Sequence, residues 1–200
     1  MSLKFGVLGG GSWATAIVKM LSENLEEVGW YMRSNYALEH IKKEQHNPNY
    51  LSAVEFNPSQ LKLSNDINEI IKYADYLIFA IPSAFVGKEL ERVTASFDNI
   101  GVITGPCHAE EVALERLSYL TIACADEEHA KIVAKHLSSD YIKTTISDDT
   151  IGTEYAAMLK NIYAIAAGIA HGLGYGDNFQ SVLMSNAIRE MKKFIKKVHK

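Results

Sequence analysis

Residues 7–14, Val7-Leu-Gly-Gly-Gly-Ser-Trp-Ala14, decide the fold of this chain. They fit the pattern G-x-G-x-x-A, with Gly9, Gly11 and Ala14 at its three fixed positions. The first glycine permits a tight turn, the second lets backbone approach a pyrophosphate, and the small third residue lets a helix pack on a strand. A short apolar run precedes the turn, and residues 12–23 have helical spacing of apolar side chains. This context predicts a strand–turn–helix unit that binds the phosphates of a dinucleotide.

The residues at the end of the second predicted strand, Val28–Met32, bear on the choice of cofactor. In NAD-binding proteins a carboxylate at this place holds the ribose 2′-hydroxyl, but this chain has Met32-Arg33-Ser34 instead. A guanidinium can pair with a 2′-phosphate or lie over the adenine. The alternative is that Arg33 is an ordinary surface arginine. We expect the cofactor to be NADPH or NADH, with NADPH accepted at least as well as NADH.

Apolar runs and helical patterns alternate along most of the chain. Strands are predicted over residues 4–8, 28–32, 76–81, 100–104, 119–124 and 141–145, and a helix is predicted over residues 85–96. Pro48 and Pro58 mark a loop-rich stretch. The segment Tyr76–Ile81 is a continuous apolar run, as expected of a central parallel strand, and Pro82 stops it. Such alternation predicts an α/β fold of the Rossmann type with a doubly wound parallel sheet. From Thr153 onward the pattern is helical only, and its small apolar surface predicts burial on all sides. We therefore expect a nucleotide-binding domain over residues 1–148 and part of an all-helical substrate domain, here truncated, over residues 149–200.

The composition argues against several other classes of protein. Hydrophobic residues make up 48% of the 200 residues and charged residues 22%, which indicates a packed core. The formal net charge of −4 argues against a non-specific nucleic-acid binder. Cys107 and Cys124 form no CxxC pair, and no targeting or membrane-spanning segment is visible, so we expect a reduced, cytoplasmic protein. His108-Ala-Glu110 lacks the P-C-x-x-C that a zinc deaminase needs, and no metal site is predicted.

Further motifs occur in the order seen in one enzyme family. They include Trp30-Tyr-Met-Arg33, His46-Asn-Pro-Asn-Tyr-Leu51, Gly105-Pro-Cys-His-Ala-Glu-Glu-Val-Ala113 and, most specific of all, Leu159-Lys-Asn-Ile-Tyr-Ala-Ile-Ala-Ala-Gly-Ile-Ala-His-Gly-Leu-Gly-Tyr-Gly-Asp-Asn178. Over nearly its whole length the chain resembles the bacterial NAD(P)-dependent glycerol-3-phosphate dehydrogenases. The resemblance implies an oxidoreductase that interconverts dihydroxyacetone phosphate and sn-glycerol 3-phosphate by hydride transfer, feeding glycerophospholipid synthesis. It also implies a homodimer with a small phosphate-ester substrate, and we expect neither nucleic acid nor a membrane as a partner.

The resemblance also assigns roles to residues. Lys160 matches the family's catalytic lysine, and its place in an apolar helix disfavours the charged amine, which suits proton exchange with the developing alkoxide. The alternative is a lysine that extends from the helix edge into solvent. Asn161 is expected to bind substrate or orient Lys160. Gly105 and Cys107 match substrate-contacting positions, although the family usually has serine or threonine at the latter, and cysteine is a weaker hydrogen-bond donor. The expected cofactor contacts are Gly9, Gly11, Ser12, Trp13, Arg33, Pro82 and Ala109.

Two pieces of the family pattern are absent. The family has a strand with a Lys-Gly pair after the helix that ends near Phe97, but here Phe97-Asp-Asn99 leads almost directly to the strand that begins at Ile100. The family's later Ser-Arg-Asn group, which grips the phosphate, does not occur before Lys200. We therefore expect the chain as written to be an incomplete enzyme. Two other functions stay open: a non-catalytic NAD(P)-binding module, and a related dehydrogenase of another small hydroxy or amino acid.

Overall fold

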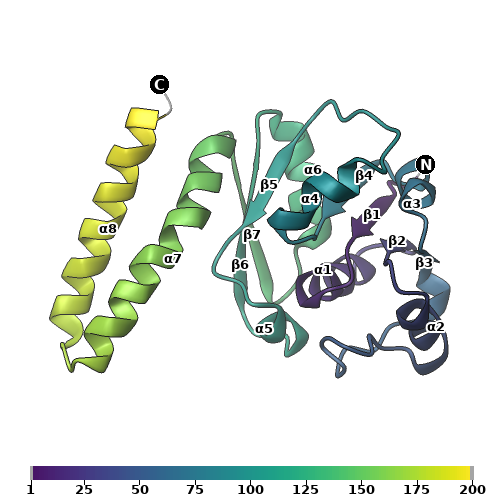
Figure 1. Ribbon diagram of the computed structural model, residues 1–200, viewed down its shortest axis with the longest axis horizontal. Helices are drawn as coiled ribbons and strands as arrows, with labels where there is room; N and C mark the ends of the chain where they lie inside the picture. The colour runs from purple at the N-terminus through teal and green to yellow at the C-terminus, as the bar shows by residue number, and fades with distance from the viewer. Residues whose placement is uncertain (1, 199–200) are drawn as a thin grey trace.

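The first part of the fold is a four-stranded parallel sheet in the order β3-β2-β1-β4, seen in a computed structural model that describes residues 2–198 (Figure 1). Its elements are β1 (Phe5–Leu8), α1 (Ser12–Ser22), β2 (Val28–Tyr31), α2 (Asn35–Glu44), a 3-10 turn (Pro58–Gln60), β3 (Leu61–Ser64), α3 (Ile67–Tyr73) and β4 (Tyr76–Phe79). β1 has neighbours on both sides, and all four of its residues are buried. β3 lies in a stretch where the sequence pattern indicates only loops.

The second part is a separate sheet of three strands in the order β5-β6-β7. α4 (Ser83–Leu90) leads into it, and its elements are β5 (Gly101–Thr104), α5 (Ala109–Ala113), β6 (Ser118–Cys124), α6 (Glu127–Leu137) and β7 (Ile142–Ser147). β6 and β7 are parallel, but β5 runs antiparallel to β6. The prediction of one wholly parallel sheet is therefore wrong in this part, although every predicted strand forms.

The strand β4 forms an edge of the first sheet and not its centre, contrary to the prediction. The helix after it ends at Leu90 instead of near Ser96, and residues 91–100 lead to β5 without a strand. Apolar residues in that segment occur singly between polar ones, so it contains no run that would form a buried parallel strand. Consequently the outer edge of β4 has no paired strand among the described residues, and three of its four residues are only partly buried.

The helix α1 joins the two sheets into one core. Ala16, Ile17 and Leu21 on this helix are buried, and they belong to the same apolar cluster as Leu120 and Ile122 of β6. α1 also packs against α5 and α6, which belong to the second sheet. The two sheets are therefore held together by side-chain packing on a shared helix.

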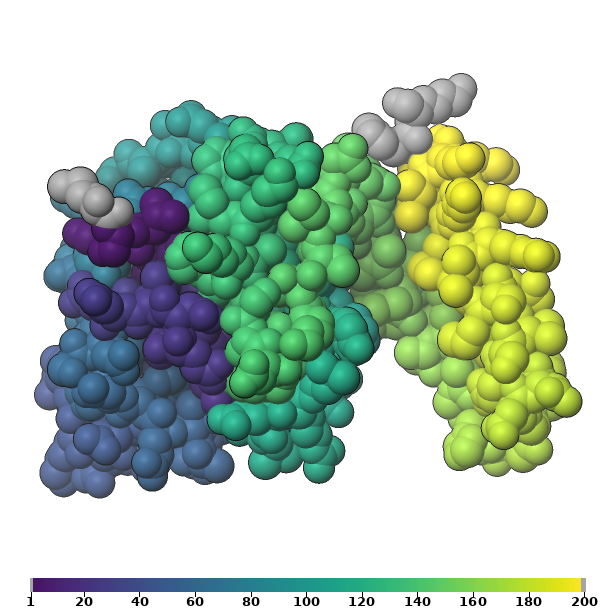
Figure 2. All heavy atoms as spheres, turned by 180° about the vertical axis from the view of Figure 1, so that it is seen from behind, coloured from purple at the N-terminus to yellow at the C-terminus, as the bar shows by residue number. Residues whose placement is uncertain are grey.

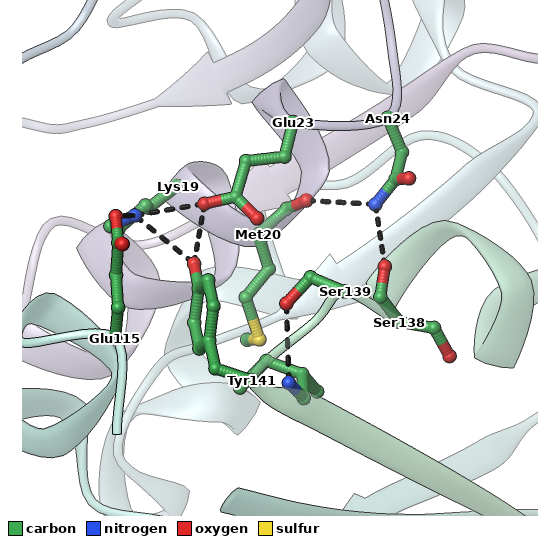
Figure 3. Close-up of polar contacts among 9 residues, drawn as sticks. Lys19, Met20, Glu23, Asn24, Glu115, Ser138, Ser139 and Tyr141 are labelled. Carbon is green, nitrogen blue, oxygen red and sulfur yellow. Dashed lines mark hydrogen bonds and ion pairs between the residues drawn. The ribbon is translucent and has the colours of Figure 1, made fainter. Parts of the chain in front are cut away.

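Polar side chains reinforce this junction along one side of α1 (Figure 3). The Lys19 amine lies 2.8 Å from a carboxylate oxygen of Glu23, 2.9 Å from one of Glu115 and 3.0 Å from the Tyr141 hydroxyl. Burial by itself would lower the pKa of Lys19, but hydrogen bonds to Glu23, Tyr141 and Glu115 raise it above its usual range. The charged amine thus ties α1 to the segments that follow α5 and precede β7.

The end of α1 is fastened to the end of α6. The Asn24 side-chain amide donates hydrogen bonds to the carbonyl oxygens of His136 at 3.0 Å and Ser138 at 2.9 Å. Figure 3 shows the bond to Ser138. These carbonyls lie where α6 ends, at a helix terminus whose last carbonyl groups have no partner within the helix. The Asn24 side chain therefore provides hydrogen-bond donors for two carbonyl groups at the C-terminal end of α6.

The last part is a hairpin of two long helices, α7 (Thr150–Gly172) and α8 (Asp177–Val198). α7 packs against β5 and α8, and Figure 2 shows the hairpin standing away from the remainder of the molecule. The prediction that this helical surface is buried on all sides is wrong for residues 2–198, because only Gly152 and Ala170 of α7 are buried. The exposed apolar residues of the hairpin include Met158, Ile162, Ile165, Ile169, Leu173, Val182 and Ile188. Within residues 2–198, no helix is both long enough and apolar enough to cross a membrane.

Candidate dinucleotide-binding cleft

The glycine turn follows β1 and is held by its neighbours. The Gly9 N–H donates a hydrogen bond to the Tyr31 carbonyl at 3.1 Å, and the Gly9 carbonyl accepts one from the Trp30 indole at 2.7 Å. Gly9 has a φ of 137°, and a Cβ added there would lie 2.3 Å from the carbonyl oxygen of Ala80. Since β4 approaches the turn so closely, only glycine fits at this position.

The first turn of α1 is open to a ligand. Gly11 is its N-cap and offers no side-chain cap, and the first turn contains no acidic residue. A Cβ added at Gly11 would meet no atom within 4 Å, so the space in front of the helix is unobstructed. Unpaired N–H groups and the positive end of the helix dipole attract phosphate at such a terminus. These residues therefore fit the pyrophosphate of a dinucleotide.

A buried asparagine between α2 and β3 supports the turn. Asn47 is 1% exposed, and its amide donates hydrogen bonds to the Gly10 carbonyl at 3.2 Å and the Thr15 hydroxyl at 2.9 Å. The Thr15 hydroxyl donates in turn to the Gly11 carbonyl at 2.9 Å. Asn47 belongs to a motif that carries the family resemblance, but the pattern alone does not indicate that it faces the glycine turn.

The turn opens into a cavity of about 610 Å³ at the carboxyl ends of β1, β2 and β4. The strand order changes direction at β1, and doubly wound sheets bind ligands at such a point. The volume suits a small-molecule site. The predicted cofactor residues that line the cavity are Gly9, Gly11, Ser12, Trp13, Arg33 and Pro82.

Arg33 reaches this cavity from the end of β2 and pairs with a carboxylate. Its Nη1 lies 3.5 Å from Oε1 of Glu89, a residue of α4 that lines the same cavity and whose side chain is 6% exposed. Oε2 of Glu89 accepts hydrogen bonds from the Tyr31 hydroxyl at 3.1 Å and Arg92 Nη1 at 3.0 Å. Burial and the neighbouring Glu89 raise the pKa of Tyr31, so its hydroxyl remains a donor at neutral pH. Local sequence patterns miss Glu89 because two of its partners, Tyr31 and Arg33, lie far away in the chain.

Three further predicted site residues follow β5 and lie outside the cavity lining. Gly105 follows β5 with a φ of 155°, and a Cβ there would lie 2.1 Å from the carbonyl oxygen of Tyr119. Cys107 is half-buried, and burial raises the pKa of its thiol, which therefore stays protonated at neutral pH. Ala109, expected to contact cofactor, is buried at the start of α5. These three positions are close in sequence to one another but are not part of the cavity wall.

Lys160 and Asn161 are exposed on α7. The expectation that Lys160 lies in buried, apolar surroundings is wrong for the described residues, because α8 and the second sheet cover only part of α7. Neither side chain lines the 610 Å³ cavity. Residues 2–198 therefore bring most predicted cofactor contacts together, but not the predicted substrate contacts.

Models of one protein family match almost the whole chain. The model described as NAD-dependent glycerol-3-phosphate dehydrogenase N-terminus matches residues 4–99 and 89–130, and the corresponding C-terminus model matches residues 149–200. The N-terminal match is divided within residues 89–99, where α4 gives way to β5. This is also where the sequence indicates that a strand is missing.

Individual relatives agree with the family models. A glycerol-3-phosphate dehydrogenase (NAD(P)+) of Exiguobacterium sp. is 33% identical over 219 residues, which include 92% of this chain and 64% of the relative. One of Lactobacillus delbrueckii subsp. bulgaricus is 30% identical over 225 residues, with 94% and 66% covered. The structure of the Plasmodium falciparum glycerol-3-phosphate dehydrogenase has a TM-score of 0.83 at 25% identity, covering 94% of this chain and 64% of that one.

The chain spans just under two thirds of the length of these bacterial relatives, 66% and 64%. Both bacterial matches extend over more positions, 225 and 219, than the 200 residues of this chain, so the relatives contain internal residues without a counterpart here. The predicted fold class, a Rossmann-type sheet followed by helices, is confirmed by the likeness to the solved structure. Since the family models match well over half of its residues, this chain belongs to the NAD-dependent glycerol-3-phosphate dehydrogenase family.

Proposed function

We propose that this chain binds NADH or NADPH in the cavity beside the glycine turn. The observation that carries this proposal is the uncapped start of α1, where nothing lies within 4 Å of a Cβ added at Gly11. The N–H groups of Ser12 and Trp13 would hold the pyrophosphate, and Arg33 would lie at the adenosine end. Pro82 and, in the whole protein, Ala109 would contact the remainder of the cofactor.

The whole protein, we propose, interconverts dihydroxyacetone phosphate and sn-glycerol 3-phosphate. A nicotinamide bound in the cavity would supply or accept the hydride. Lys160 donates or accepts the proton at the oxygen on C2, and Asn161 orients Lys160 or hydrogen-bonds the substrate. Gly105 and Cys107 contact the substrate, largely through backbone, because a protonated thiol is a weak donor. Since Lys160 is exposed on α7, the bound substrate itself would have to remove water from the amine.

The proposed setting follows from the same family membership. Residues 1–148 would form the cofactor domain and residues 149–200 the beginning of the substrate domain. The whole protein would act in the cytoplasm as a homodimer and feed glycerophospholipid synthesis. The exposed apolar side chains of α7 and α8 favour further protein contacts for this hairpin.

One observation favours a second candidate, a module that binds NAD(P)(H) without turnover. Gly105, Cys107, Lys160 and Asn161 all lie outside the cavity lining. A chain with only the cofactor half of the site would bind dinucleotide and leave the substrate unconverted.

Mixing the purified whole protein with dihydroxyacetone phosphate and either reduced cofactor distinguishes the two candidates. Loss of the dihydronicotinamide absorbance with formation of glycerol 3-phosphate supports the dehydrogenase. Binding of the cofactor, seen by fluorescence titration, without oxidation supports the module. Absence of both binding and turnover would contradict the two proposals together.

A further inference from the structure

The buried carboxylate of Glu89 lies in the cavity wall near β2. The residues that directly follow β2 contain no carboxylate of their own. In NAD-binding sheets the carboxylate that holds the ribose 2′-hydroxyl follows the second strand, and that place has Met32-Arg33-Ser34 here. Glu89 comes from α4, yet its carboxylate lies 3.1 Å from the hydroxyl of Tyr31, the last residue of β2. The side chain is 6% exposed and lines the cavity. A different element thus brings a carboxylate into the cavity wall, beside the side chains of Tyr31 and Arg33.

The two oxygens of Glu89 have different surroundings. Oε2 accepts hydrogen bonds from Tyr31 and from Arg92 Nη1, at 3.1 and 3.0 Å, which fix the carboxylate in place. Oε1 makes a longer contact, 3.5 Å to Nη1 of Arg33. A carboxylate oxygen has two acceptor sites, so Oε1 retains the capacity to accept a further hydrogen bond beside Arg33.

The charges of Glu89 and Arg33 have opposite effects on the relative affinity for NADH and NADPH. A 2′-phosphate is an anion that a guanidinium attracts and a carboxylate repels, whereas a 2′-hydroxyl can donate a hydrogen bond to the carboxylate. Because Glu89 is buried, its repulsion is screened less than that of a surface carboxylate.

We propose that Glu89 is a cofactor-selecting residue, whose carboxylate accepts a hydrogen bond from the ribose 2′-hydroxyl and opposes the 2′-phosphate that Arg33 would otherwise favour. This inference rests on the proposed binding of NADH or NADPH in the cavity. The Glu89 carboxylate reduces the preference for binding NADPH that Arg33 alone suggests, because it already pairs with the arginine.

The test is the ratio of two dissociation constants, for NADH and for NADPH, measured on the purified chain by dihydronicotinamide fluorescence. Glu89→Gln keeps the shape of the side chain and one acceptor oxygen for Tyr31 and Arg92, but removes the charge. We expect this variant to shift the ratio toward NADPH by roughly tenfold, the effect of removing one charge near a dianion in a partly buried site. A ratio is insensitive to any fraction of misfolded protein, and Glu89→Ala gives a second variant without the charge.

Glu91→Gln is the matched control, because it removes an equal charge next to the same helix at an exposed residue outside the cavity lining. Its ratio should equal that of the wild type. If Glu89→Gln and Glu89→Ala alter both dissociation constants by the same factor, Glu89 has only a structural role and the inference is overturned. If the wild type and the Glu91→Gln variant bind neither dinucleotide, the proposed function fails, and this inference falls with it.

Discussion

Asn47 donates a hydrogen bond to the hydroxyl of Thr15 across 2.9 Å, and both side chains are buried behind the glycine turn. We predict that Asn47→Ala lowers the free energy of unfolding by about 1–3 kcal/mol, because the Gly10 carbonyl loses a buried partner. It should also weaken cofactor binding, since the turn loses its support. Urea unfolding and fluorescence titration measure the two effects, with the exposed Asn65→Ala as control. Unchanged stability would show that Asn47 does not hold the turn.

Gly11 offers a way to block the cleft without disturbing the fold. A Cβ there meets no protein atom within 4 Å, but it enters the space assigned to the pyrophosphate. We predict that Gly11→Ala leaves the melting temperature within a few degrees of the wild type and weakens binding of both dinucleotides at least about tenfold. Tight binding in this variant would place the pyrophosphate elsewhere.

Two other glycines serve as controls for that experiment. Gly9→Ala should fold poorly, because its Cβ would lie 2.3 Å from the Ala80 carbonyl oxygen and its φ of 137° is strained for alanine. Gly87→Ala, on α4 with open space around it, should fold and bind normally and gain about 0.5–1 kcal/mol of stability. Circular dichroism melting curves distinguish the three variants.

Lys160 is the residue on which the proposed chemistry depends. In a chain that turns over dihydroxyacetone phosphate, we predict that Lys160→Ala lowers turnover about a hundredfold while cofactor binding persists. Lys192→Ala, which removes an exposed lysine from α8, should leave turnover unchanged. Near-normal turnover in the Lys160 variant would remove this lysine from the mechanism.

The raised pKa of Tyr141 makes the stability of the fold depend on pH in the alkaline range. Burial and the hydrogen bond to Glu23 raise the pKa of Tyr141 to about 12, so the unfolded chain releases this proton at a lower pH than the folded one. Lys19 has a raised pKa as well, so the folded chain also keeps that proton longer. Stability therefore falls as pH rises from about 10 to about 12. Chemical unfolding across this range should give a shallower decline for Tyr141→Phe, and an equal decline would contradict the assignment.

The glycine turn could be predicted from sequence because Gly9, Gly11 and Ala14 recur at a fixed spacing, and the structure places them between β1 and α1 as the pattern predicts. The atom that excludes a side chain at Gly9, the carbonyl oxygen of Ala80, is far away in the chain and is not visible in the pattern. Asn47 and Glu89 act through contacts with residues far away in the chain, and no spacing rule reports such contacts. The sequence does not predict β3, because Leu61-Lys-Leu-Ser64 is too short for a clear alternating pattern.

The predictions of the fold that are wrong concern the position of a strand in its sheet and the burial of a helix, and both depend on neighbouring elements. The apolar run of β4 predicts a central strand, but centrality depends on a neighbour that the residues after α4 do not provide. The apolar surface of α7 predicts burial, but burial depends on elements that would cover Lys160 and its neighbours. A periodic pattern describes the preference of a segment, whereas burial also needs a partner.

The two sheets, which separate between β4 and β5, are expected to unfold locally as different units. No backbone hydrogen-bond ladder among residues 2–198 runs from the first sheet into the second, so the two share α1 and not a common strand. Because side-chain packing on α1, rather than strand pairing, joins the two sheets, we predict that each opens as a separate cooperative unit. The amide hydrogens of β5, β6 and β7 should therefore exchange with solvent deuterium through an opening that leaves β1 and β2 protected, and bound dinucleotide should slow exchange in the first unit more than in the second.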